Sequence, residues 1–274
     1  MKKQKMRLDD FLVIEGFYQS KTRAQRAVMA GVILVNEQKI DKPGKPVDAS
    51  SKIRILGPDL PYVSRGGLKL DKALSEFKVD VKDRICLDVG ASTGGFTDCL
   101  LQHGAAHVYA VDVGYGEFAW KLRNDPRVTV IEKTNIRYLT WEKIHLTVLR
   151  LPAEAQRAKE GPPSSVLHER TNLAVIDVSF ISLTKVLPAI IDILEKPYEI
   201  IALIKPQFEA GKDQVGKGGI IKDPLIHQQV LDNITAFVHG LKLEIIGITD
   251  SPISGADGNK EFLMYLTCNP DGVR

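Results

Sequence analysis

A short apolar run followed by a glycine-rich turn constrains the fold of this chain more than any other feature. Ile85–Val89 has the pattern of a strand buried on both faces, which is typical of the centre of a parallel sheet. Gly90, Gly94 and Gly95 follow it, and residues 97–102 are expected to begin a helix. Such a strand, turn and helix start place free backbone N–H groups around an open crevice. The stretch therefore predicts an α/β sheet with a ligand site, although a plain connecting turn without a ligand has the same pattern.

The spacing of these glycines does not fit a dinucleotide site. The turn has the form G-x-x-x-G-G, whereas dinucleotide-binding folds use G-x-G-x-x-G. Asp88 comes just before the turn, where a carboxylate suits a cation or a hydroxyl better than a phosphate. We therefore expect S-adenosylmethionine, which carries an ammonium and a sulfonium group but no phosphate. The residues expected to contact it are Asp88, Gly90, Ala91, Ser92, Thr93, Gly94, Gly95 and Phe96.

Two further strands are predicted downstream, each with polar residues at its carboxyl end. Residues 107–113 are expected to form a strand with Asp112 near its end, where α/β folds present an acid to ribose hydroxyls. Val128–Ile131 is the next strand, and Asn135 and Ile136 follow it in a position that could flank an adenine ring. We add these three residues to the expected cofactor contacts, although a lone acid at a strand end is also common without a ligand.

An acid and a base follow the next two predicted strands. The fourth strand begins at Leu173 and ends at Asp177, and the fifth covers 200–204 and is followed by Lys205. The carboxyl ends of parallel strands surround the ligand crevice, so we expect Asp177 and Lys205 to face it, and Asp177 to contact the cofactor as well. A lysine that extends its charged end into solvent is the alternative for Lys205.

The last two strands are predicted at 243–250 and 262–268, with Glu261 directly before the second of them. Their short connection favours an antiparallel pair, unlike the alternation of strands and helices upstream. Five such alternating units followed by a hairpin describe a Rossmann-like α/β sheet of seven strands, the fold of class I methyltransferases.

The first 57 residues are expected to form a separate small α+β domain with a basic surface. They contain 12 Lys+Arg against 6 Asp+Glu, whereas the remaining residues contain 25 against 28. Helices are predicted at 6–14 and 21–30, a hairpin at 32–40 and a closing strand at 53–55. A basic unit favours a polyanionic partner such as RNA, although solvated lysines give the same balance. The candidate RNA-contacting residues are Arg7, Lys21, Arg23, Arg26, Lys39 and, beyond this domain, Arg65.

A stretch rich in glycine and proline marks the predicted domain boundary. Residues 57–67 contain two prolines and three glycines, so we expect 58–67 to be a linker. The methyltransferase domain is then 68–274 and begins with a helix at 68–77. Residues from about 145 to 170 contain three prolines and fit the strand and helix pattern poorly, so they are expected to be an insertion.

The cysteines and the hydropathy pattern bear on where the protein works. Cys86, Cys99 and Cys268 are odd in number and lack the spacing of metal ligands, which suits a reduced, cytoplasmic protein without a metal site. No apolar run approaches the roughly 18 residues of a membrane span, and no signal peptide is recognisable. We expect a monomer that does not bind membranes.

Several motifs together are similar to those of one family. Residues 7–12 and 20–36 resemble the RNA-binding S4 module of a small-subunit ribosomal protein, which also occurs in pseudouridine synthases and tyrosyl-tRNA synthetases. Joined to the second domain, they resemble the TlyA family, in which this module precedes an FtsJ-like methyltransferase. The resemblance to TlyA rests on residues 64–69, 88–98, 177–183 and 204–209 and covers nearly the whole chain except about 145–170.

The resemblance implies 2′-O-methylation of a cytidine in ribosomal RNA. It assigns a catalytic Lys-Asp-Lys-Glu tetrad to Lys69, Asp177, Lys205 and Glu261. A ribose hydroxyl is a weak nucleophile, so the reaction needs a positioned base, and we expect Lys205 to be that base. Asp177 and Glu261 are expected to orient the two ammonium groups and the hydroxyl.

Other activities are less well supported by the sequence. An exocyclic-amine methyltransferase usually has Asp/Asn-Pro-Pro-Tyr where this chain has Asp177-Val-Ser-Phe180, and a pyrimidine C5 enzyme needs a cysteine nucleophile at that edge. A ribosome-assembly factor without catalytic activity stays an alternative, and so does a haemolysin-like membrane activity, a name given to some TlyA relatives. The chain ends six residues after Cys268, which favours large-subunit RNA over both subunits as the expected substrate.

Overall fold

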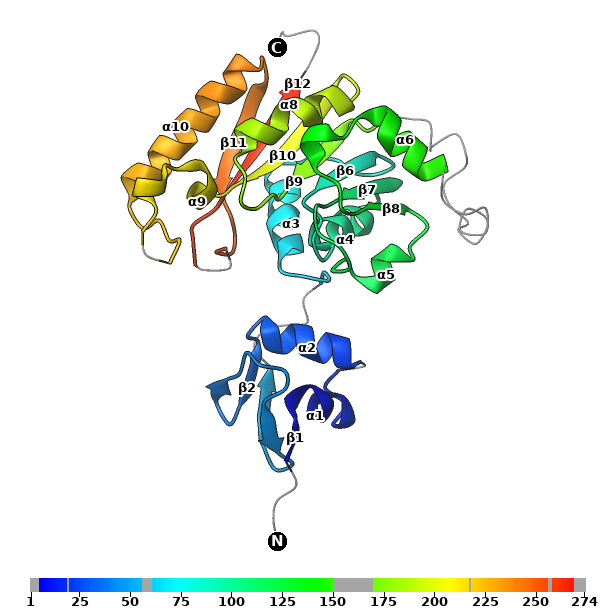
Figure 1. The fold of residues 1–274 in the computed structure, drawn as a ribbon, viewed down its shortest axis with the longest axis vertical. Coiled ribbons are helices and arrows are strands. Elements are labelled where there is room, and N and C mark those ends of the chain that lie inside the picture. Colours follow the sequence, from blue (N-terminus) through cyan, green and yellow to red (C-terminus); the bar gives the residue numbers. More distant parts are fainter. Residues whose placement is uncertain are drawn as a thin grey trace. The chain divides into compact units, whose positions relative to one another are not determined.

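The computed structural model consists of two compact units, Met1–Leu60 and Pro61–Arg274, which are described separately here (Figure 1). The residues that the structure describes are 5–18, 20–55, 61–149, 170–216, 218–255 and 258–268.

The first unit is a small α+β fold. Ser20 begins its second helix, because its hydroxyl accepts a hydrogen bond from the Arg23 amide at 3.4 Å. Asn36 and Glu37 both have positive φ and form the tight hairpin turn. The predicted helices, hairpin and closing strand are confirmed, whereas the β1–β4 pair was not predicted because such short strands show no alternation. Its elements are β1 (Lys5–Arg7), α1 (Leu8–Ile14), α2 (Lys21–Met29), β2 (Ile33–Val35), β3 (Gln38–Lys39), β4 (Pro46–Asp48) and β5 (Ile53–Ile55).

The second unit is built on the predicted seven-stranded sheet, with strand order β11-β12-β10-β9-β6-β7-β8. β12 runs antiparallel to both of its neighbours, and the other described pairs are parallel. This is the mixed sheet of class I methyltransferases, so the predicted fold class is confirmed. The strands are β6 (Ile85–Val89), β7 (His107–Val111), β8 (Val128–Ile131), β9 (Leu173–Ile176), β10 (Tyr198–Ile204), β11 (Glu244–Asp250) and β12 (Phe262–Cys268).

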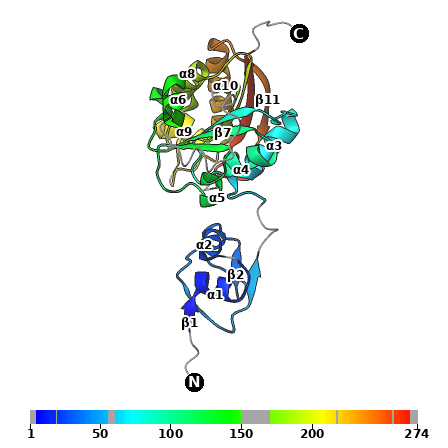
Figure 2. The same ribbon diagram turned by 90° about the vertical axis from the view of Figure 1, so that its right-hand side faces the viewer.

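Helices cover both faces of this sheet and enclose two hydrophobic cores (Figure 2). One core packs α3 and α4 against the sheet, and the other packs α8 and α10 against the opposite face. None of the helices within the described residues is both long and apolar enough to cross a membrane. The helical segments are α3 (Gly66–Phe77), α4 (Gly95–Gln102), α5 (Trp120–Arg123), η1 (Ile136–Tyr138), α6 (Trp141–Leu149), α8 (Leu183–Ile193), α9 (Pro206–Glu209), η3 (Lys212–Gln214) and α10 (Pro224–Gly240).

The start of the second unit lies inside the stretch that was expected to be a linker. Tyr62 is buried, and the Val63 amide donates a hydrogen bond to Asp98 at 2.8 Å. Helix α3 begins at Gly66, two residues before the predicted start. Gly67 in its first turn makes room for the Tyr62 ring, which would lie 2.3 Å from a Cβ at that position. Residues 58–60 of the predicted linker and 150–169 of the predicted insertion lie outside the described residues, and 145–149 complete α6.

Candidate active site

The residues predicted to be catalytic gather at one edge of the second unit's sheet. β9 and β10 are parallel, so Asp177 and Lys205 follow their carboxyl ends on the same side. β12 is antiparallel to β10, and its first residue pairs with the last residue of β10. Glu261, which precedes β12, therefore lies at this edge too. The fourth residue, Lys69, comes from helix α3.

Two ion pairs connect these four residues. The Lys69 ammonium lies 2.6 Å from a Glu261 carboxylate oxygen, and these side chains are only 10% and 2% exposed. The Lys205 ammonium lies 2.6 Å from the Asp177 carboxylate and also donates a hydrogen bond to the Ser179 hydroxyl at 2.9 Å. Two lysines that are each about nine-tenths buried need such partners, because an unpaired buried charge is strongly unfavourable.

The glycine turn between β6 and α4 packs directly against this catalytic edge. Gly90 has a φ of +85°, and a Cβ there would lie 2.4 Å from the backbone oxygen of Asp177. The Asp177 amide in turn donates a hydrogen bond to the Val89 carbonyl at 2.9 Å. The turn expected to hold the cofactor and the loop that carries Asp177 are therefore in contact through backbone atoms.

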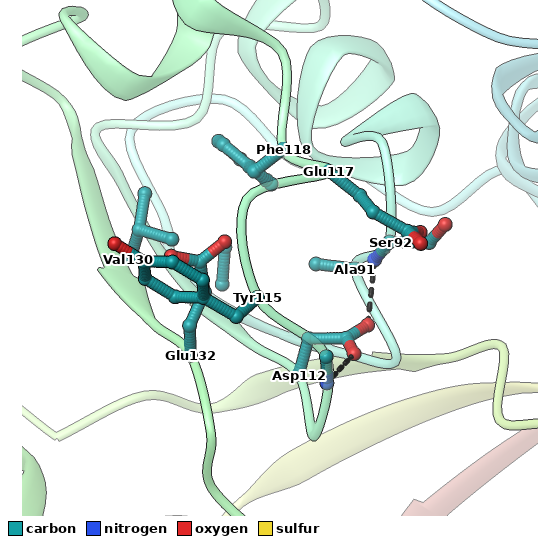
Figure 3. A pocket seen from close by; sticks show the side chains of 10 residues that line it. Ala91, Ser92, Asp112, Tyr115, Glu117, Phe118, Val130 and Glu132 are labelled. Carbon is teal, nitrogen blue, oxygen red and sulfur yellow. Dashed lines mark hydrogen bonds between the residues drawn. The ribbon is translucent and has the colours of Figure 1, made fainter.

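Asp112 anchors the far side of the turn. Its two carboxylate oxygens accept hydrogen bonds from the backbone amides of Ser92 at 2.7 Å and Gly114 at 2.6 Å. Figure 3 shows these bonds beside a small pocket, whose lining includes Tyr115 and Glu132. A carboxylate offers about four lone-pair sites, so Asp112 retains acceptor capacity for the hydroxyls of a ribose.

Asp88 lies in β6 and is completely buried. One of its oxygens accepts a hydrogen bond from the Thr97 hydroxyl at 2.6 Å, while the other has no hydrogen-bond partner among the described residues. Burial raises the pKa of this carboxyl from 3.8 to about 7. An unsatisfied buried oxygen is unusual in a native protein and suits a cationic or hydrogen-bonding ligand.

These features fit S-adenosylmethionine better than a phosphate-bearing ligand. Carboxylates stand on or after three adjacent strands of the sheet, at Asp88, Asp112 and Asp177. Residues 88–97 contain no lysine or arginine that could neutralise a phosphate. The turn would place Gly90–Gly95 amides and these acids around an ammonium, a ribose and a sulfonium.

Some expected cofactor contacts have other roles in the structure. The Phe96 and Ile136 side chains are 3% and 5% exposed and belong to the two hydrophobic cores. The Asn135 side chain accepts a hydrogen bond from the Arg137 amide and so begins η1. Their contact with a cofactor stays a prediction, as does that of the exposed Ser92 and its neighbour Thr93.

Residues next to the ion pairs were not singled out from the sequence. Ser179 contacts Lys205, and Phe180 is 90% exposed with a φ of +62°. Its ring centre lies 5.0 Å from that of Phe208. The signal for them was present, because they lie within the motifs 177–183 and 204–209 that carried the family resemblance.

Glu209 joins the two loops that carry Asp177 and Lys205. Its carboxylate accepts hydrogen bonds from the Ser182 hydroxyl at 2.5 Å and the Leu183 amide at 2.8 Å. Burial raises the pKa of this carboxyl. The bonds fix the start of α8 against α9, and so they hold the loop after β9 next to the turn after β10.

The candidate RNA-contacting residues of the first unit fall into two groups. Arg7 forms hydrogen bonds of 2.9 and 2.7 Å with the buried Asp9, and Lys21 pairs with Asp10 at 2.6 Å. The Arg7 guanidinium lowers the pKa of Asp9 to about 2. Both cations therefore have local structural partners.

The remaining candidates lie elsewhere on the surface. Arg23 and Arg26 project from α2, and the Lys39 side chain lies against Gly31. Arg65 directly precedes α3 and belongs to the second unit. RNA contact by any of the six residues stays a prediction.

Comparison with known proteins identifies the family of each of the two units. The S4 domain family matches residues 6–53, and the FtsJ-like methyltransferase family matches residues 62–268. Relatives that are 39–47% identical align over 95–98% of the chain. The chain belongs to the TlyA family.

Three TlyA relatives illustrate the range of names in the family. The chain is 47% identical over 266 residues to "Putative rRNA methyltransferase YqxC" of Bacillus subtilis, covering 97% of this chain and 87% of the relative. It is 40% identical to "Hemolysin A" of Brachyspira hyodysenteriae, covering 95% and 99%. It is 39% identical to "16S/23S rRNA (cytidine-2'-O)-methyltransferase TlyA" of Mycobacterium tuberculosis, covering 98% and 92%.

A solved structure of a TlyA-like protein has the same fold. It is named "Putative hemolysin from Streptococcus thermophilus" and has a TM-score of 0.70 and 41% identity to this chain. The match covers 98% of this chain and 90% of that one. The FtsJ-like methyltransferase fold of this family implies use of S-adenosylmethionine.

The contact between Gly90 and Asp177 predicts an unusually costly alanine substitution. Gly90→Ala should lower the free energy of unfolding by about 1–2 kcal/mol through its positive φ and by about 1–3 kcal/mol more through overlap with Asp177. Gly116→Ala is the matched control, since its φ is +81° but a Cβ there meets no heavy atom within 4 Å. Chemical denaturation of both variants measures the difference, and equal losses would contradict the proposed contact.

The buried Asp88 predicts a specific dependence of stability on pH. In the folded state the Asp88 carboxyl, with its pKa of about 7, keeps its proton up to about pH 7. In the unfolded state the same carboxyl loses its proton near pH 3.8. Stability of the cofactor-free protein should therefore fall as pH rises across this window, by at most about 1.4 kcal/mol per pH unit from this group. Asp88→Asn should remove that part of the slope in denaturation measured at several pH values. A variant with the wild-type slope would show that Asp88 is already ionised when the protein folds.

Proposed function

We propose that this TlyA-family protein transfers a methyl group from S-adenosylmethionine to the 2′-hydroxyl of a cytidine in ribosomal RNA. The observation that carries the proposal is the pair of ion pairs Lys69–Glu261 and Lys205–Asp177 at the sheet edge next to the glycine turn. The name of the Mycobacterium tuberculosis relative supports both the cytidine and the position of the methyl group.

Lys205 is the proposed base. S-adenosylmethionine supplies an electrophilic sulfonium methyl group when bound. The attacking 2′-hydroxyl must lose its proton, and Lys205 can accept it only after its own ammonium, paired with Asp177 in the resting site, has released a proton to solvent. Asp177 lies 2.6 Å from the Lys205 nitrogen and so stabilises the ammonium that results. The Ser179 hydroxyl fixes the direction of the amine from a second side.

Lys69 and Glu261 complete the proposed site. Their ion pair is nearly free of solvent, so each holds the other in one position. Glu261 can accept a hydrogen bond from the substrate hydroxyl, and Lys69 can stabilise negative charge as the hydroxyl proton leaves. With both lysines protonated, the two pairs carry no net charge together.

An aromatic pair beside the base supports a nucleotide substrate. Phe180 is largely exposed, and the Lys205 nitrogen lies 5.9 Å from the centre of the Phe208 ring. Exposed aromatic rings stack on nucleotide bases that have left a helix. We propose that the target base stacks on the exposed ring of Phe180, while Lys205 accepts the proton from the 2′-hydroxyl of the same nucleotide.

The first unit is proposed to supply RNA affinity. An S4 domain and the rRNA methyltransferase relatives imply binding to ribosomal RNA. We propose that Arg23 and Arg26 of α2 contact phosphates, while Arg7 and Lys21 mainly stabilise the unit through their acidic partners. Large-subunit RNA is the proposed substrate, which places the enzyme in the cytoplasm with the ribosome.

The decisive test of the proposed base is Lys205→Ala. Loss of the base should reduce methyl transfer to ribosomal RNA by about 10²–10⁴-fold, while binding of S-adenosylmethionine measured by calorimetry stays within a few-fold. Lys185→Ala, at an exposed lysine of α8, is the control and should keep full activity. Near-normal turnover by Lys205→Ala would exclude this lysine as the base. Wild-type protein that binds no S-adenosylmethionine would instead favour an assembly factor without catalytic activity.

The proposed phosphate contacts predict a change in salt dependence. Replacing Arg23 and Arg26 together by alanine should weaken binding to ribosomal RNA and reduce the slope of log affinity against log salt by about 1–2. Arg54→Ala is the control, because Arg54 is paired with Glu37 on the same unit. Filter binding at several salt concentrations gives both slopes. An unchanged slope in the double variant would show that α2 does not contact phosphates.

A further inference from the structure

A second cluster of reactive side chains lies away from the proposed active site. It consists of Asp71 on α3, Cys99 on α4 and His103, which directly follows α4. One carboxylate oxygen, the thiol sulfur and an imidazole nitrogen all lie within 4.8 Å of one another. Neither the proposed methyl transfer nor the RNA contacts use these residues.

The positions of the three residues favour joint binding of one ion. Cys99 and His103 are four residues apart, so they project from the same side of the helix end. Asp71 comes from α3, which packs against α4 in the same hydrophobic core. Two ligands from one helix turn and a third from a neighbouring helix are a common way to hold a metal ion.

The hydrogen bonding of His103 leaves one ring nitrogen facing a carboxylate. Nδ1 lies 2.9 Å from the Cys99 carbonyl oxygen, which can only accept, so Nδ1 carries the hydrogen. In the neutral ring Nε2 is then an acceptor, and it lies 3.3 Å from the Asp71 carboxylate. A proton on Nε2 or a cation bound between the two atoms would make this contact favourable.

The hydrogen bond from His103 Nδ1 to the Cys99 carbonyl also suits the imidazole to metal binding. Imidazole ligands of metals usually donate their other N–H to a carbonyl or carboxylate, which fixes the ring orientation. Zinc bonds of about 2.0–2.2 Å at tetrahedral angles place a nitrogen and an oxygen ligand about 3.4 Å apart. The observed separation of Nε2 and the Asp71 oxygen is 3.3 Å.

We propose that Asp71, Cys99 and His103 form a binding site for a zinc-class divalent cation. The cation would be bound by one carboxylate, one thiolate and Nε2 of one neutral imidazole, with water as the fourth ligand. Binding breaks the S–H bond of Cys99 and releases its proton to solvent. The two negative ligands then balance the charge of the ion.

Tyr62 completes the surroundings of the site. Tyr62 is buried, and this burial, together with the interaction of its hydroxyl with both Cys99 and Asp71, raises the pKa of Tyr62. Tyr62 therefore orients two of the three ligands. The bound ion would connect α3, which carries Lys69, to α4, which begins at the glycine turn. We assign it a structural role, because it fixes the two helices that lead to the proposed active site.

Cobalt binding to the full-length protein tests this site directly. After chelator treatment under reducing conditions, Co²⁺ should give a thiolate-to-cobalt charge-transfer band and tetrahedral ligand-field bands that saturate at one ion per chain. Zinc should displace the cobalt and raise the melting temperature of the protein.

Three variants and one control distinguish metal binding by Asp71, Cys99 and His103 from adventitious metal binding elsewhere on the protein. Asp71→Asn and His103→Gln change partly exposed side chains and should each weaken Co²⁺ binding at least about tenfold. Cys99→Ser should abolish the charge-transfer band, whereas Cys268→Ser, at a thiol outside the cluster, should leave it unchanged.

Two results would overturn the proposal. Absence of the charge-transfer band in folded wild-type protein would leave an ordinary ion pair between Asp71 and a protonated His103. Equal binding by wild type and by both Asp71→Asn and His103→Gln would place the metal elsewhere.

Discussion

The burial of two lysines at one edge of the sheet is the constraint on which the proposed active site depends. A charged lysine that is about nine-tenths buried needs an acidic partner, and Glu261 serves Lys69 while Asp177 serves Lys205. Glu261 and Lys69 are 192 residues apart in sequence, and the packing of α3 against the sheet brings them together. The order of β9, β10 and β12 therefore determines the chemistry as much as the side chains do.

The glycine turn that is expected to hold the cofactor is in direct contact with the sheet edge that carries the predicted catalytic residues. Gly90 lacks a side chain where the backbone of Asp177 passes, and Glu209 holds the following loop against the turn after Lys205. A shift of the glycine turn would move Asp177, and with it the partner of the proposed base. In the sequence, the only sign of this contact between the turn and Asp177 is the glycine at position 90.

The sequence predicted much of the fold because its strands are unbroken apolar runs. Ile85–Val89, Val128–Ile131 and Phe262–Cys268 are strands with the predicted bounds. The linker was harder to predict, since glycines that open a helix look like glycines in a loop. The Asp71–Cys99–His103 cluster was missed because its third ligand comes from another helix. The ion pairs likewise needed the family resemblance before the fold showed their geometry.

Nucleoside analysis of methylated ribosomal RNA tests the central claim most directly. The protein would be incubated with methyl-labelled S-adenosylmethionine and with separated large and small ribosomal subunits, and the RNA would be digested to nucleosides for mass spectrometry. The two ion pairs and the family relationship predict label in 2′-O-methylcytidine of ribosomal RNA, and the separated subunits show which RNA carries it. Label on a nucleobase, or no label in either subunit, would contradict the proposed reaction.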